Sequence, residues 1–265
     1  MVTTRSGRTT HTTTTTRRSP KRRMVRKKKN AIPRTLSGLV KVLDKKLGET
    51  KYHELEVGMT KEGLVRTVAS TLLGANIVTG DLRSNREGIK INLMSVNIRG
   101  FFQHQYNPTT TENQFKVPIF VTVLVVATKR DDDPLTYMFR NINNNTPVAY
   151  GTVATANTAQ GDQIRETAAL NTEDIRILKR RRITVRPPGI NDPSVYTTRS
   201  LYMNVKINKT LTYSVGQTAS IPIPSAQIKP NIWCIYYVTQ NNSIVTDDTL
   251  EMLGTMRIVC KYKDI

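Results

Sequence analysis

Alternation of apolar and polar residues is the feature that most restricts how this chain can fold. The segments 94–99, 201–208 and 256–261 place an apolar side chain at every second position and, except at Val259, polar side chains or Tyr202 between them. This period is typical of antiparallel strands that are buried on one face. A fourth segment, 117–129, is almost continuously apolar and β-branched, as expected for a central strand of a sandwich.

Four further strands are predicted at residues 51–57, 173–186, 218–223 and 231–240. The strands are not separated by the helical patterns of roughly 10–15 residues that a parallel α/β sheet requires. Long loops are instead predicted at 140–171 and 187–196. We therefore predict an all-β fold over residues 50–265, an eight-stranded antiparallel jelly-roll sandwich, in preference to a regular barrel.

The N-terminal segment, residues 1–34, has no hydrophobic periodicity and is rich first in Thr and then in Arg and Lys. The first 43 residues hold 13 basic side chains and no acidic one, out of a formal net charge of +20. Such a segment cannot bury enough apolar area to offset its ordering entropy, so we predict a disordered arm. It can displace counterions from a phosphate backbone, which indicates nucleic-acid binding. The predicted contacts are Arg5, Arg8, Arg17, Arg18, Lys21, Arg22, Arg23, Arg26, Lys27, Lys28, Lys29 and Arg34.

Residues 35–49 are predicted to form a short amphipathic helix that links the arm to the sandwich, because five aliphatic residues recur there at helical spacing. The helix could pack on the protein or lie on a membrane surface, and packing is the favoured interpretation because it lacks an aromatic anchor. No stretch of the chain approaches the roughly 20 apolar residues needed to span a bilayer. We therefore expect no membrane insertion.

A second basic run, Lys179, Arg180, Arg181 and Arg182, lies inside the predicted strand 173–186. Because alternate residues of a strand face opposite ways, two of its charges should point to each side of the sheet. The run is interpreted either as a solvated edge or as a further contact to nucleic acid.

Motifs for catalysis are not recognisable in the sequence. There are three histidines, no phosphate-binding glycine loop and no nucleophile elbow, so we predict neither an enzyme nor a cofactor. Asp131, Asp132 and Asp133 form a weak candidate Ca²⁺ site, with a solvated turn as the favoured interpretation. Cys234 and Cys260 interrupt apolar runs and are predicted to be buried free thiols, although a disulfide is possible.

Several segments, taken in order, resemble the capsid proteins of small circular single-stranded DNA viruses that encode a Rep protein, the group with circovirus-like and geminivirus-like members. They are residues 80–102 with Arg86, Gly88 and Gly100, then 119–134, 177–185, 199–214, and the last two strands ending in Arg257 to Asp264. The resemblance implies a jelly-roll subunit, about 60 copies in an icosahedral shell, and a basic arm turned inward onto the genome.

The leading hypothesis from the sequence is thus a structural protein that assembles with itself and packages single-stranded nucleic acid, DNA in preference to RNA. It would reside in the virion and, before assembly, in the host nucleus. An import receptor would then bind Arg17, Arg18, Lys21, Arg22, Arg23, Arg26, Lys27, Lys28 and Lys29. The alternatives are a monomeric or non-viral nucleic-acid-binding β-domain, and the coat protein of a small RNA or satellite virus.

Overall fold

The computed structural model describes residues 49–62, 65–80, 85–105, 117–141, 145–153, 159–187, 197–214, 222–240 and 250–265. The chain divides into two compact units, Met1–Val42 and Leu43–Ile265, and every described residue belongs to the second. Its elements, in chain order, are β1 (Thr50–Glu62), β2 (Val65–Arg66), β3 (Val68–Leu72), β4 (Lys90–His104), β5 (Ile119–Thr128), η2 (Pro134–Thr136), β6 (Phe139–Arg140), β7 (Pro147–Val148), α2 (Ala159–Thr167), β8 (Ile175–Val185), β9 (Thr198–Tyr213), η3 (Ser225–Gln227), β10 (Ile228–Lys229), β11 (Asn231–Gln240) and β12 (Leu250–Asp264).

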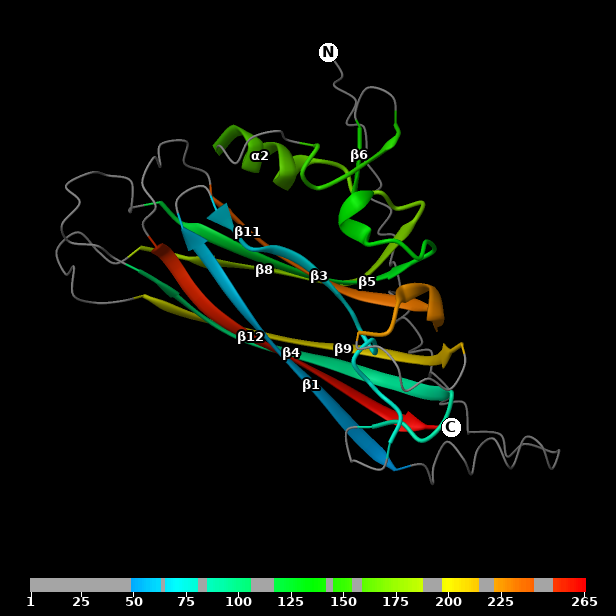
Figure 1. The fold of residues 1–265 in the computed structure, drawn as a ribbon. Helices are drawn as coiled ribbons and strands as arrows, with labels where there is room; N and C mark the ends of the chain where they lie inside the picture. The colour runs from blue at the N-terminus through cyan, green and yellow to red at the C-terminus, as the bar shows by residue number, and fades with distance from the viewer. Residues whose placement is uncertain are drawn as a thin grey trace, which may run out of the picture. The chain divides into compact units, whose positions relative to one another are not determined.

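These strands form two antiparallel sheets that face each other (Figure 1). The first sheet has the order β10-β9-β4-β12-β1-β2 and the second has the order β3-β11-β5-β8, with β6 and β7 paired separately. Without the two-residue strands, eight remain. Numbered along the chain, they run 6-3-8-1 in the first sheet and 2-7-4-5 in the second. Two sheets of four antiparallel strands in this order are a jelly roll, so the predicted fold class is confirmed.

The first sheet is buried on one face only, as its alternation predicts. In β4, β9 and β12 the positions that point inward are largely apolar, and the positions between them are largely polar and exposed or half-buried. The inward set belongs to one core and includes Val96, Ile98, Met203, Val205, Met256 and Ile258. The register of β4 and β12 keeps Ile98 directly opposite Ile258, which holds both apolar rows on the core side.

A close approach inside this sheet requires two glycines. A Cβ on Gly254 would lie 2.3 Å from the ring of Phe102 and 2.9 Å from the backbone oxygen of Phe101, and one on Gly100 would lie 2.6 Å from the same ring. The buried Phe102 ring therefore lies across two backbone positions that carry no side chain.

The second sheet is covered on both faces, which explains why residues 117–129 are continuously apolar. Every residue of β11 is buried, and so are most residues of β5. The segment after β5 packs over the outer face, where the Tyr150 ring lies 5.2 Å from the Tyr237 ring and 6.0 Å from the Phe139 ring (Figure 1). The core therefore extends from between the sheets to beyond the second one.

The structure departs from the sequence predictions at several points. Of the strand predicted at 218–223, only Pro222 and Ile223 are described, and neither is in a strand; residues 218–221 lie outside the described part. The eighth strand is instead β3, in a segment where none was predicted, and it pairs with β11. The segment 140–171 is not only loop, because it contains β7 and α2. No described helix is long and apolar enough to cross a membrane.

Candidate nucleic-acid interface

Most of the predicted nucleic-acid contacts lie outside the described residues. All twelve arm positions lie there: Arg5, Arg8, Arg17, Arg18, Lys21, Arg22, Arg23, Arg26, Lys27, Lys28, Lys29 and Arg34. The helix predicted at 35–49 also lies outside the described residues, except for Glu49. The described part of the interface is the basic run in β8.

This run lies on an open edge of the sandwich. Among the described strands, β8 is the last of the second sheet and pairs only with β5. The side chains of Lys179, Arg180, Arg181 and Arg182 are all exposed. They point alternately to opposite sides of the sheet, as their contacts show, so the prediction of two charges on each side is confirmed.

Lys179 and Arg181 reach the neighbouring edge of the first sheet. Lys179 Nζ donates to the carbonyl oxygen of Asn204 at 3.0 Å, and Arg181 donates to that of Tyr202 at 2.7 Å. Both carbonyls lie in β9, whose outer edge pairs with β10 only at Thr212 and Tyr213. The two cations therefore satisfy backbone acceptors that a further strand would otherwise take. Among the described residues neither cation forms an ion pair, so both keep their charge for a further ligand.

Arg180 and Arg182 point to the other side, toward α2. Both guanidinium groups contact Glu166 Oε2, at 3.4 and 3.1 Å, and the Arg182 guanidinium also lies 3.9 Å from the centre of the Phe120 ring. The other carboxylate oxygen of Glu166 accepts a hydrogen bond from Thr239 at 2.8 Å. A single carboxylate thus partly neutralises two cations and ties α2 to the sheet.

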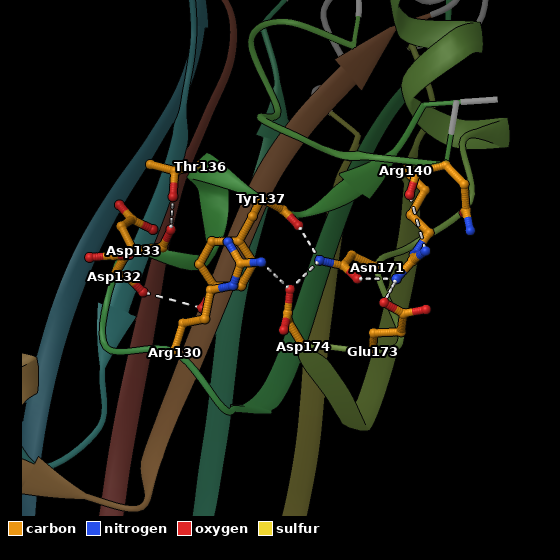
Figure 2. Close-up of polar contacts among 10 residues, drawn as sticks. Arg130, Asp132, Asp133, Thr136, Tyr137, Arg140, Asn171, Glu173 and Asp174 are labelled. Atoms are coloured by element: carbon orange, nitrogen blue, oxygen red, sulfur yellow. Dashed lines mark hydrogen bonds and ion pairs between the residues drawn. The ribbon is translucent and has the colours of Figure 1, made fainter. Parts of the chain in front are cut away.

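The aspartates of the turn bind protein groups; Figure 2 shows two of them, Asp132 and Asp133. Asp133 Oδ1 accepts hydrogen bonds from Ser70 Oγ at 2.6 Å and from the backbone N–H of Leu135 at 2.9 Å, and so caps η2. Asp131 forms an ion pair with Lys229 and accepts from Asn231 at 2.9 Å. Within the described ranges, no three His, Cys, Asp or Glu residues are grouped so that they could hold a metal ion.

A polar network next to this turn anchors the start of β8 (Figure 2). Asn171 Nδ2 donates to the carbonyl of Tyr137 at 3.1 Å and to Asp174 at 3.0 Å. Asp174 also pairs with Arg130 at 2.7 Å, and the Asn171 side-chain oxygen accepts from Arg140 at 3.2 Å. The hydrogen bond from Asn171, with help from Arg130, lowers the pKa of Asp174, so the carboxylate stays ionised. The network is structural: it joins the segment after β5 to the strand that carries the basic run.

Buried titratable groups elsewhere serve the fold. Burial lowers the pKa of His53 and of His104, so both imidazoles are neutral near pH 7. Cys234 and Cys260 are buried free thiols, as predicted. Burial raises the pKa of Cys260 to about 12 and raises that of Cys234 as well, which leaves both thiols protonated and unreactive.

The sequence interpretation overlooked three exposed aromatic residues on the first sheet. Tyr52, Phe101 and Tyr202 are each about half exposed, at 53%, 50% and 50%. They occupy outward positions of β1, β4 and β9, on the face opposite the core. The alternation of the strands could have predicted their exposure, because all three residues occupy positions that are otherwise polar.

Comparison with known proteins gives no family. No family model matches the chain, and no curated protein matches it. Solved structures that align with it are the virus-like particle of the Macrobrachium rosenbergii nodavirus (10% identity, 82% of this chain and 96% of that chain, TM-score 0.29), turnip yellow mosaic virus (12%, 82% and 83%, 0.29) and honeybee sacbrood virus (7%, 82% and 87%, 0.31). TM-scores and identities this low establish neither common fold nor common function, so the fold assignment rests on the strand order alone.

Proposed function

We propose that this protein is a viral capsid protein that assembles with itself into a small icosahedral shell and packages single-stranded DNA through its basic arm. The observation that carries the proposal is the combination of two parts in one chain. One part is a jelly roll, and the other is an N-terminal segment with 13 basic and no acidic residues in 43 positions. Jelly rolls also occur in lectins and cupins, so the arm decides between these roles.

The physical argument is charge compensation. A shell of about 60 copies would bring on the order of 800 arm cations to one interior, and these would offset the phosphate repulsion that opposes compaction of a genome. The jelly roll supplies rigid subunits, and the arm supplies attraction that does not depend on base sequence. The role is structural, because the contacts described above hold the fold together and assemble no reacting groups.

Electron microscopy and gel filtration of the purified chain test the proposal. About 60 copies of the 29.9 kDa chain give a particle of about 1.8 MDa. Deletion of residues 1–30 should leave the sandwich folded and the particles largely free of nucleic acid. A monomer near 30 kDa that binds DNA would overturn the shell and favour the second candidate, a monomeric nucleic-acid-binding β-domain. Nuclease sensitivity of the packaged material distinguishes DNA from an RNA genome.

The same arm would direct the subunit to the host nucleus before it enters the virion. Residues 17–29 contain two basic clusters, which an acidic groove of an import receptor would hold. Fusing residues 1–34 to a fluorescent reporter that is too large for passive diffusion tests this step. We expect nuclear fluorescence, and its loss when Lys27, Lys28 and Lys29 are replaced by Ala. Cytoplasmic fluorescence of the unchanged fusion would refute it.

A further inference from the structure

The outward face of the first sheet combines exposed rings with cations. Tyr202 in β9 is directly opposite Arg99 in β4, and Tyr52 in β1 is directly opposite Lys261 in β12. The Arg99 guanidinium lies 5.7 Å from the centre of the Tyr202 ring, and the Lys261 ammonium lies 5.7 Å from the centre of the Tyr52 ring. Each half-exposed ring therefore has a positive charge beside it.

The charge on this face is predominantly positive. Its outward positions carry Arg99, Lys206, Arg257 and Lys261, against Glu54 and Glu56. Glu54 is paired with Arg257 at 2.5 Å. Among the described residues, Arg99, Lys206 and Lys261 have no carboxylate in ion-pair contact. Three cations thus remain available to phosphate groups.

The face is also hollowed beside Tyr52 and Arg99. A depression of about 490 Å³ is lined by Tyr52, Ser95, Asn97, Arg99, Asn204 and Lys261, together with Glu54, Arg257 and Val259. Its amide and hydroxyl side chains can both donate and accept hydrogen bonds. Three strand spacings of about 4.8 Å and four residues of about 3.3 Å separate Tyr52 from Tyr202, which places them about 19 Å apart. A single strand that contacts both rings would therefore have to extend over more than one nucleotide.

We propose that this face is a second nucleic-acid site, at which bases of a single strand stack on Tyr52 and Tyr202 while Arg99, Lys206 and Lys261 bind the adjacent phosphates. Rings that alternate with cations on a sheet are the arrangement by which proteins bind single strands with little sequence preference. Duplex DNA, whose bases are already stacked on each other, offers no free base faces to these rings. The occupant is therefore single-stranded.

Chain connectivity supports the same occupant. Thr50 begins β1, and Arg34, the last predicted contact of the arm, is 16 residues before it. Sixteen residues span at most about 58 Å. Because the arm and this face belong to one chain, a strand bound by the arm meets the face at a higher effective concentration than a free strand does. This inference rests on the proposed packaging function, because the packaged single strand would be its ligand. The site would add contacts to bases to the charge neutralisation that the arm provides.

The test is photocross-linking of the full chain to oligo(dT) that contains 5-iododeoxyuridine, followed by peptide mapping. We expect cross-links at Tyr202 and Tyr52 in addition to any in residues 1–48. Binding of the same oligonucleotide at high salt, where phosphate contacts are weakened, should fall at least about 30-fold in the Tyr52→Ala/Tyr202→Ala variant, because two stacking contacts are lost. The slope of log affinity against log salt should stay the same in that variant. In Arg99→Ala the slope should flatten by about 0.7.

Two exposed positions of β8 provide matched controls: Ile177→Ala removes an exposed apolar side chain, and Arg176→Ala removes an exposed cation, both away from the face. Neither should change the mapped cross-links. Cross-links confined to residues 1–48, or a double variant with unchanged binding, would overturn this inference. If the double variant with unchanged binding also lost assembly, the face would be a protein interface. Electron microscopy tests the shell independently of the cross-links. Cross-links at Tyr52 and Tyr202 in a protein that forms no particles would refute the proposed shell and support the nucleic-acid site.

Discussion

The buried ion pair between Lys61 and Glu251 lends itself to a quantitative prediction of stability. Both side chains are completely buried, and they join β1 to the start of β12. The second carboxylate oxygen of Glu251 accepts a hydrogen bond from Gln240 at 2.8 Å. Burial lowers the pKa of Lys61, and the attraction of Glu251 opposes this shift. The attraction of Glu251 therefore offsets part of the cost of burying the Lys61 ammonium.

Replacing Lys61 with Met removes the ammonium and keeps most of the side-chain volume. The carboxylate of Glu251 then stays buried without its cation, and breaking a buried pair in this way costs about 3–5 kcal/mol. Against a typical total of about 5–15 kcal/mol, that is a severe loss. Replacing both partners, as Lys61→Met/Glu251→Leu, removes the uncompensated charge. The double variant should recover most of the lost free energy of unfolding.

Urea unfolding of the full chain, followed by the fluorescence of Trp233, measures both effects. Lys90→Met is the matched control, because Lys90 is an exposed lysine of β4, and it should change the free energy of unfolding by less than about 0.5 kcal/mol. The reasoning would be refuted if Lys61→Met cost less than about 1 kcal/mol, or if the double variant were no more stable than the single one.

Three further predictions concern the glycine contact, the histidines and the arm. Gly254→Ala should lower stability by about 1–3 kcal/mol, because the new methyl group meets Phe102 and backbone, whereas Gly58→Ala has nothing within 4 Å and should be tolerated in thermal unfolding. Since burial lowers the pKa of His104, the unfolded chain takes up its proton first. Stability should therefore fall as the pH drops below about 6.5, and His104→Gln should flatten this dependence in urea unfolding at several pH values. Replacing Lys27, Lys28 and Lys29 with Ala should flatten the salt dependence of single-stranded DNA binding by about 2 units in anisotropy titrations, and a strong sequence preference would contradict it.

Strands whose own residues encode burial were predictable from the sequence. The alternation of β4, β9 and β12 predicts which side of each strand faces the core, and the apolar run of β5 predicts that this strand is buried on both sides. Strand β3 was not predictable, because four of its five residues are only half-buried and small or β-branched without alternation. Its strand conformation comes from pairing with β11, which is a tertiary effect.

Helix α2 was missed for a similar reason. Its sequence, AQGDQIRET, has an internal Gly and no apolar stripe. Its stability comes from contacts across the fold: Arg165 is buried with its guanidinium 5.0 Å from the centre of the Tyr150 ring, and Glu166 binds β8 and β11. Residues that lie far apart along the chain supply these partners, so no local pattern could indicate them.

The candidate interface was predictable in charge and not in geometry. The period of a strand was enough to divide Lys179 to Arg182 between two sides. The carbonyl acceptors in β9 depend on which edges the jelly roll brings together, and no residue type signals that. Tyr52 and Tyr202 were not singled out in the sequence, although the strand period already places them on the solvent side.

The pairing of β1 with β12 has a consequence for how the molecule is made. Thr50 lies opposite Lys263, so the first strand of the jelly roll finds its main partner in the last one, more than 200 residues later. A ribosome releases the polycationic arm and β1 long before β12 exists, and loop closure over such a separation is slow. A chain truncated before Leu250 would lack the strand between β1 and β4 and could not close the first sheet. The first sheet can therefore form only after the chain has been translated through β12.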